Sequence, residues 1–125
     1  MKINLTKKQS LEFFYNALCN GLMTLGDYGI ELTYNDLEYE ASRIKLTDAC
    51  FEDVLIQMLR DGYKLSTIDH EGDDLYSVSI GINEVYERVK LVPVADLADM
   101  INENDDGYTA DAILQTVFFK EIIFG

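Results

Sequence analysis

The segment from Phe51 to Gly62 is the part of the chain whose structure the sequence constrains most strongly. Its large apolar residues recur at the three- and four-residue spacing of one helix face, which is typical of a helix packed against a core. Thr47 and Asp48 precede this face as capping residues, and Gly62 follows it as a C-terminal stop. We therefore predict an amphipathic helix with a buried face made of Phe51, Val54, Leu55, Met58 and Leu59.

Upstream of this helix, the sequence predicts a long helix, a strand and a shorter helix. Thr6 can cap the first helix, which Asn20 and Gly21 are expected to end or loosen. Residues 30–34 alternate apolar and polar side chains, as a strand with one buried face does. Asn35 then caps a helix over 36–44. The buried stripe of the first helix is predicted to be Leu11, Phe14, Tyr15, Leu18 and Leu22.

Downstream, two strands at 64–69 and 75–80 are joined by the turn HEGDD, which predicts a hairpin. Three helices follow, the first over 82–89, the second after Pro93 and the third from about Thr109. The predicted fold class is α+β: a mostly helical single domain over 1–125 with a small antiparallel sheet.

The element order over residues 7–80 is helix, strand, helix, helix, strand, strand, and it resembles winged helix-turn-helix topology. The domain would then consist of a winged-helix-like part, 1–80, and a C-terminal helical part, 81–125. In a winged helix the second helix of the turn pair enters the major groove of DNA, so the resemblance implies basic or amide side chains there. Here the solvent side of that helix carries Asp48, Glu52, Asp53, Gln57 and Arg60.

The chain is strongly acidic, with 23 acidic and 10 basic residues and a net charge of −13. Such a surface repels phosphates and anionic lipid, and attracts cationic partners. We therefore expect an acidic protein-interaction module that binds a basic protein, with charge mimicry of DNA as one form of this function. The expected partner-binding residues are Asp48, Glu52, Asp53, Asp73, Asp74, Asp96, Asp99 and Glu103.

Two other interpretations of the charge remain open. The acidity can serve solubility alone. Alternatively, the chain is a winged-helix nucleic-acid-binding protein whose few basic residues gather on one face; these are Lys2, Lys7, Lys8, Arg60, Lys64 and Lys90.

The residues that usually carry catalysis or bind metals are few. His70 is the single histidine, and Cys19, Cys50 and His70 are too scattered for a zinc site. Both cysteines are expected to be reduced, buried thiols, and the acids around Cys50 oppose thiolate formation. We predict no enzyme, cofactor or metal, with an enzyme using the carboxylate-rich turn at His70 as the least favoured alternative.

The loop that begins at Asn102 has oxygen ligands and a glycine at the spacing of a calcium-binding EF-hand. Its twelfth position, however, is Ile113 instead of the bidentate glutamate that such a site requires. We therefore expect this loop to be a connection between two helices.

The last nine residues carry six large apolar side chains, which either close the core or form a homodimer interface. No apolar run is long enough for a membrane span, and a cytoplasmic location is expected. The tracts FEDVLIQMLRDGYKL and DMINENDDGYTADAILQTVFFKEIIFG resemble small proteins carried by tailed phages of gut Bacteroidetes. The resemblance implies a phage origin and the host cytoplasm, and brings no activity or site.

Overall fold

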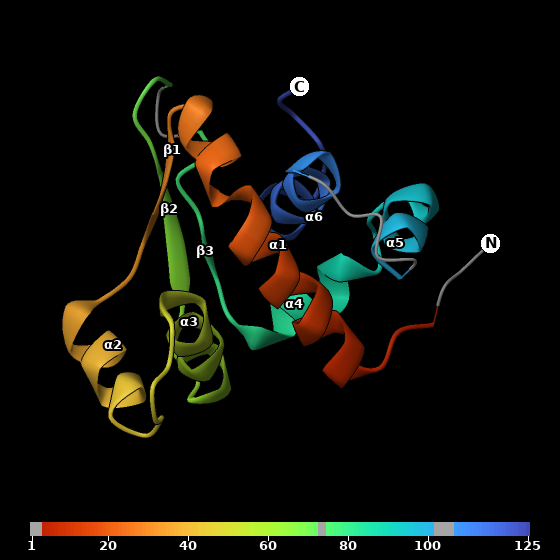
Figure 1. Cartoon of the computed structure of the whole chain (residues 1–125). Coiled ribbons are helices and arrows are strands. Elements are labelled where there is room, and N and C mark those ends of the chain that lie inside the picture. Colours follow the sequence, from red (N-terminus) through yellow and green to blue (C-terminus); the bar gives the residue numbers. More distant parts are fainter. Residues whose placement is uncertain (1–3, 73–74, 102–106) are drawn as a thin grey trace.

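The computed structural model describes residues 4–72, 75–101 and 107–125, which form six helices and a three-stranded antiparallel sheet (Figure 1). The α+β class and the single-domain architecture with a small sheet are confirmed. The predicted element order is also confirmed. In chain order the elements are α1 (Lys7–Asp27), β1 (Ile30–Thr33), α2 (Asp36–Arg43), α3 (Phe51–Arg60), β2 (Leu65–Asp69), β3 (Ser79–Ile80), α4 (Ile82–Val89), α5 (Val94–Ile101) and α6 (Gly107–Phe119).

Helix α1 is the central element and crosses the whole molecule (Figure 1). Thr6 and Gln9 form a capping box at its start, as the threonine cap predicts. The expected break at Asn20 and Gly21 is wrong, because the helix continues to Asp27. Gly21 is buried against α6, where a Cβ atom would lie 2.9 Å from Leu114 Cδ1 and 3.0 Å from Ala110 Cβ. The glycine therefore serves close packing of two helices instead of ending one.

Helix α3 begins three residues later than Asp48. Cys50 is its N-cap, and Asp48 lies in the preceding loop with a left-handed φ of 52°. Gly62 follows with a φ of 88°, which confirms it as the C-terminal stop. The predicted inward face is also confirmed, since Val54, Leu55, Met58 and Leu59 are buried and Phe51 is half-buried.

The sheet has the order β1-β2-β3, with Ile30 opposite Asp69 and Leu65 opposite Ile80. The predicted strand over 75–80 is mostly wrong, because β3 contains only Ser79 and Ile80. Thr67 explains part of the difference. Its backbone N–H donates to the Val78 carbonyl at 2.8 Å, as in a strand ladder. Its hydroxyl, however, accepts the Val78 N–H at 3.1 Å and donates to the Tyr76 carbonyl at 2.6 Å, so side-chain bonds replace further backbone pairing there.

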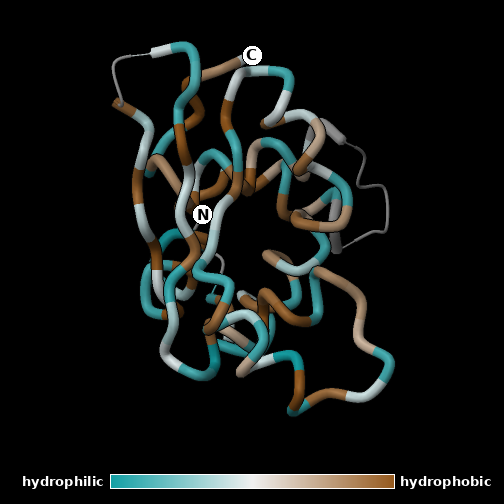
Figure 2. Tube along the Cα trace, turned by 90° about the vertical axis from the view of Figure 1, so that its left-hand side faces the viewer, coloured by the Kyte–Doolittle hydropathy of each residue, from teal (hydrophilic) through white to brown (hydrophobic). Residues whose placement is uncertain are grey.

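The core surrounds α1, which packs against α6, α4, α3 and β1. Helices α1 and α6 make the most extensive contact, and Phe14 meets Phe118 there at 6.0 Å between ring centroids. The strands stand in front of this helical layer in Figure 2, where apolar and polar residues alternate along β1. This arrangement leaves the outer sides of α2, α3 and α5 facing solvent.

The apolar C-terminal segment closes the core of its own chain. Val117 and Phe118 are buried, Phe119 and Phe124 are half-buried against the core, and Ile123 is half-buried. Phe124 stacks on Tyr28 with 4.9 Å between ring centroids. Ile122 remains 47% exposed. Core closure is therefore the role that the fold gives this segment, and a homodimer through it stays a prediction.

Candidate functional site

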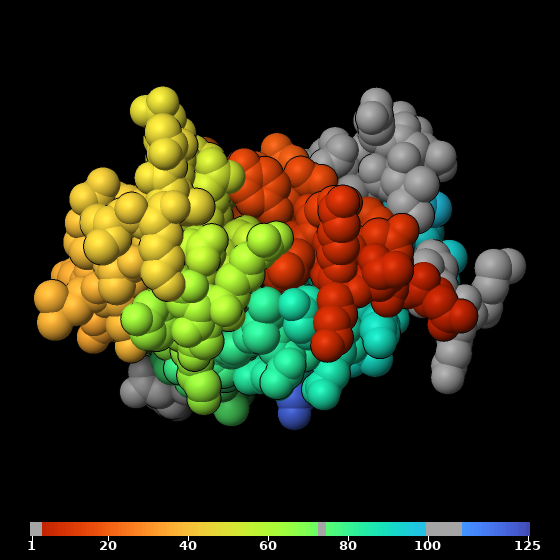
Figure 3. Space-filling model, turned by 90° about the horizontal axis from the view of Figure 1, so that it is seen from below, coloured from red at the N-terminus to blue at the C-terminus, as the bar shows by residue number. Residues whose placement is uncertain are grey.

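A groove runs between the N-terminal half of α1 and helix α3, and encloses about 610 Å³. Figure 3 shows the hollow between the red start of the chain and the lime-coloured α3. The groove lies where the buried apolar face of each helix meets its solvent-exposed face. Both helices therefore line the groove with a mixture of apolar and polar side chains. The groove is lined by Lys8, Leu11, Glu12, Tyr15, Asn16, Leu46, Thr47, Ala49, Asp53, Ile56, Gln57 and Arg60.

Charged side chains of both signs line this groove, and Glu12 follows Lys8 by about one turn of α1. Tyr15 reaches the start of α3, so the middle of α1 faces Cys50 and Asp53. Lys8, near the start of α1, and Arg60, at the end of α3, also line this groove. The residues Asp48, Glu52 and Asp53, at and just before the start of α3, are called the acidic end below. Of these three, Asp53 lines the groove.

The Tyr15 hydroxyl is the polar centre of the acidic end. Its oxygen lies 3.7 Å from the Cys50 Sγ atom. The Cys50 thiol and then the Asp53 carboxylate raise the pKa of Tyr15 well above its usual value. The tyrosine therefore stays a neutral hydrogen-bond donor at physiological pH and is not a general base.

Asp53 has a structural role at the same place. Its Oδ2 atom accepts the Cys50 backbone N–H at 3.1 Å, as a capping carboxylate does at the start of a helix. This backbone N–H, followed by the Cys50 thiol, lowers the pKa of Asp53. The residue is thus both part of the acidic end and the cap of α3.

The two cysteines are exposed, which corrects the expectation of buried thiols. Cys50 is displaced outward because it precedes α3 as its N-cap instead of lying inside the helix. Cys19 lies on the side of α1 that faces α3, where partial desolvation of its sulfur, despite the hydrogen bond from Tyr15, raises the pKa of Cys19.

The predicted partner-binding acids do not share one face. Asp48, Glu52 and Asp53 lie together at the start of α3, whereas Asp96 and Asp99 belong to α5 on the opposite side of the molecule (Figure 1). Asp99 is exposed and Asp96 is half-buried. Asp73, Asp74 and Glu103, together with the loop 102–106 of the calcium hypothesis, lie outside the described residues.

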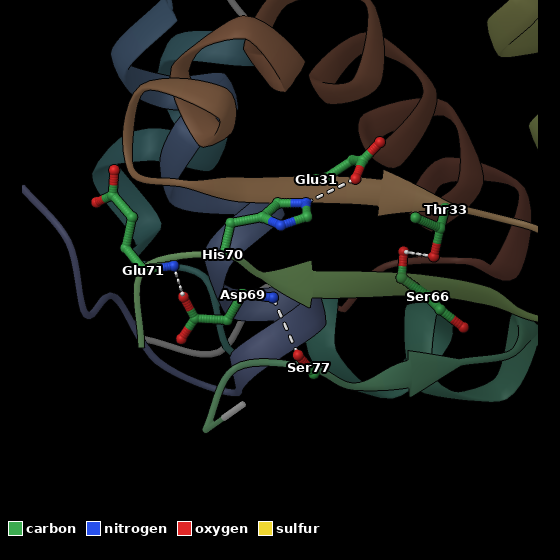
Figure 4. Close-up of polar contacts among 7 residues, drawn as sticks. All are labelled: Glu31, Thr33, Ser66, Asp69, His70, Glu71 and Ser77. Atoms are coloured by element: carbon green, nitrogen blue, oxygen red, sulfur yellow. Dashed lines mark hydrogen bonds and ion pairs between the residues drawn. The ribbon is translucent and has the colours of Figure 1, made fainter. Parts of the chain in front are cut away.

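The carboxylate-rich turn after β2 is held by hydrogen bonds of its own (Figure 4). Asp69 is buried and its Oδ1 atom accepts the N–H groups of Glu71 at 3.1 Å and of Gly72 at 2.9 Å. His70 Nε2 lies 2.7 Å from Glu31 Oε1 on β1, with both side chains more than half exposed. Among the described residues, no group of three or more potential ligands could hold a metal ion. These contacts stabilise the turn, and the enzyme alternative stays untested.

Of the acids that line the groove, sequence reasoning identified Asp53 and missed Glu12, and it missed the groove itself. Tyr15 is predicted as a core residue, yet it is half-buried and directs its hydroxyl to the acidic end. The signal that could have marked it is its position at the polar edge of the α1 stripe, beside Asn16. Leu46 and Ala49 carry no such signal, because a loop places them there.

Comparison with known proteins identifies no relative of this chain. No protein-family model, curated protein or solved structure matches this chain. Among helices in the described ranges, none combines the length and hydropathy that a bilayer crossing requires.

Proposed function

We propose that the chain is an acidic protein-interaction module that binds a basic partner protein at the acidic end of the groove between α1 and α3. The observation that carries this proposal is the pairing of uncompensated carboxylates with an apolar floor. Asp48 and Glu52 form no ion pair with any described residue. Beside them, Leu11, Tyr15 and Ile56 line the groove.

The carboxylates and the apolar floor of the groove contribute to binding in different ways. The carboxylates of the exposed Asp48 and the half-buried Glu52 steer a cationic partner and select against anionic ones, because Coulomb attraction acts over about 10 Å at 0.1 M salt. The apolar floor supplies area that a partner side chain can bury, at roughly 25 cal/mol per Å². A protein that normally binds DNA is one class of basic partner that this surface would attract.

The expectation of a winged-helix nucleic-acid binder has one supporting observation. Lys8 and Arg60 line the same groove, which brings two of the basic residues together. Glu12 and Asp53 line the groove as well, and each carboxylate that faces a phosphate opposes binding. A basic protein therefore remains the better fit.

The test compares capture of basic proteins from a bacterial lysate by three immobilised chains. The first is the wild type, and the second carries Asp48→Asn with Glu52→Gln. Asparagine is chosen because it tolerates the left-handed backbone of Asp48, and Asp53 is left intact because it caps α3. The matched control carries Asp27→Asn with Glu87→Gln, which removes the same charge from exposed sites on α1 and α4.

We expect the wild type and the control to capture the same basic proteins at low salt and to release them at high salt. The groove variant should lose this capture. Equal capture by both variants would contradict the proposal, as would capture that salt does not weaken. A mobility-shift titration with duplex DNA tests the alternative, and tight binding that Lys8→Ala and Arg60→Ala abolish would replace the proposal with it.

A further inference from the structure

Two thiols from distant parts of the chain lie beside the same hydroxyl group. Cys50 Sγ is 3.7 Å from the Tyr15 oxygen, at the N-cap of α3. Cys19 follows Tyr15 by four residues on α1, which places both side chains on one face of that helix. The Cys19 thiol also interacts with the Tyr15 hydroxyl and with Cys50. Both thiols therefore flank the Tyr15 side chain where α1 meets α3.

We propose that Cys19 and Cys50 are a modification site, at which a small-molecule disulfide such as oxidised glutathione converts the two thiols into a reversible disulfide bond. This bond would tie the middle of α1 to the start of α3. The inference does not depend on the proposed function, since it concerns the chemistry of the thiols alone.

The surroundings of both cysteines allow this reaction. Each thiol is exposed, so a small oxidant can reach it. Cys50 ends an exposed loop in which Lys45, Thr47 and Asp48 face solvent, and a loop of this kind can shift to bring its sulfur into bonding geometry. A change of the Cys19 side-chain rotamer on the surface of α1 can move its sulfur toward the Cys50 sulfur.

The chemistry balances in two exchange steps. The thiolate of one cysteine attacks a sulfur of oxidised glutathione, forms a mixed disulfide and releases one glutathione thiolate. The thiolate of the other cysteine then attacks the protein sulfur of that mixed disulfide and releases the second glutathione. The protein loses two electrons and two thiol protons, and one molecule of oxidised glutathione gains them and becomes two molecules of reduced glutathione.

The electrostatic setting of Cys19 determines how this reaction depends on pH. Partial desolvation is the main cause that raises the pKa of Cys19, and the nearby Glu52 carboxylate adds to it. Its thiolate, which is the reactive form, is therefore scarce near neutral pH and becomes more abundant as pH rises. Formation of the cross-link should accelerate in mildly alkaline buffer.

The experiment incubates the folded, reduced chain with a glutathione redox buffer, traps it with acid and maps it by mass spectrometry without reduction. We expect a monomer that has lost the mass of two hydrogen atoms, with Cys19 and Cys50 in one cross-linked peptide. The same chain in denaturant should instead carry glutathione on each cysteine, because unfolding separates the two sulfurs.

Two variants make the result specific to this geometry. Cys19→Ser should leave a stable mixed disulfide on Cys50. The double variant Cys19→Ser with Met23→Cys moves the thiol one turn along α1 to an exposed position, and should also give mixed disulfides only. The proposal is overturned if the folded wild type gains one glutathione per cysteine, forms cross-linked dimers, or cross-links equally well when folded and when denatured.

Discussion

Gln115 holds Phe124 with both ends of its side-chain amide. Its Nε2 atom donates to the Phe124 carbonyl at 3.1 Å, and its Oε1 atom accepts the Phe124 N–H at 2.8 Å. Oε1 also accepts the Ile123 N–H at 2.7 Å. Gln115 is fully buried in α6. Its side-chain amide satisfies backbone N–H and C=O groups of the C-terminal segment, as a neighbouring strand would do in a sheet. The C-terminal segment is thereby part of the folded domain.

Replacing Gln115 with leucine should therefore destabilise the domain strongly. The substitution introduces an apolar side chain of similar size and leaves the backbone groups of Ile123 and Phe124 without their partner, at about 1–3 kcal/mol for each group that water cannot reach. We expect the free energy of unfolding in urea to fall by about 2–4 kcal/mol. Asn83→Ala, at an exposed position of α4, is the control and should change it by less than about 0.5 kcal/mol. A loss as small as that of the control would refute the role of Gln115.

Two glycines of α1 should respond in opposite directions to the same substitution. Gly21→Ala places a methyl group 2.9 Å from Leu114 Cδ1, and such overpacking costs about 1–3 kcal/mol. Gly26→Ala meets no atom within 4 Å and gains the higher helix propensity of alanine, about 0.5–1 kcal/mol. Urea unfolding of the two variants checks this, and a stabilising Gly21→Ala would show that α1 and α6 are not in close contact.

Acid should destabilise the fold through Asp61 and Asp53. The Ser42 hydroxyl at 2.7 Å, the Lys45 ammonium at 3.0 Å and the Gln57 amide at 2.9 Å hold the pKa of Asp61 below its ordinary 3.8. The backbone N–H of Cys50 likewise lowers the pKa of Asp53. A lowered pKa in the folded state stabilises the fold above the ordinary value, and this contribution is lost as pH falls through the folded-state pKa.

The free energy of unfolding should consequently decrease between about pH 5 and about pH 2. Asp61→Asn removes one of the two groups, so its stability should fall less steeply than that of the wild type over this range. Identical slopes for the two chains would show that Asp61 is not stabilised in its charged form.

Salt should stabilise this chain against heat. Its net charge of −13 produces repulsion among exposed carboxylates, and raising the salt from about 0.01 M to about 1 M shortens the Debye length from about 30 Å to about 3 Å. We expect the midpoint of thermal unfolding to rise with sodium chloride. The variant Asp36→Asn with Asp99→Asn, which neutralises two exposed acids, should show a smaller rise. A midpoint that falls as salt is added would mean that attractive ion pairs dominate.

The elements that the sequence predicted correctly are those whose cause is local. The apolar spacing of 51–59 and the stop at Gly62 produce α3, and the capping residues Thr6 and Asn35 start α1 and α2. Each of these signals acts within a few residues along the chain, through backbone dihedrals, caps and the period of one helix face. The acids of the α3 first turn were identified for the same reason.

The tertiary structure decided what depends on contacts between distant residues. Gly21 has the local signature of a helix end and becomes a packing site only because α6 lies against it. The strand expected at 75–80 shortens because Thr67 binds the backbone of the following loop. The groove exists because packing brings α1 beside α3, although β1 and α2 separate them in sequence. Residue order along a chain specifies local conformation, whereas the neighbours of a side chain across a core follow from the packing of all elements together.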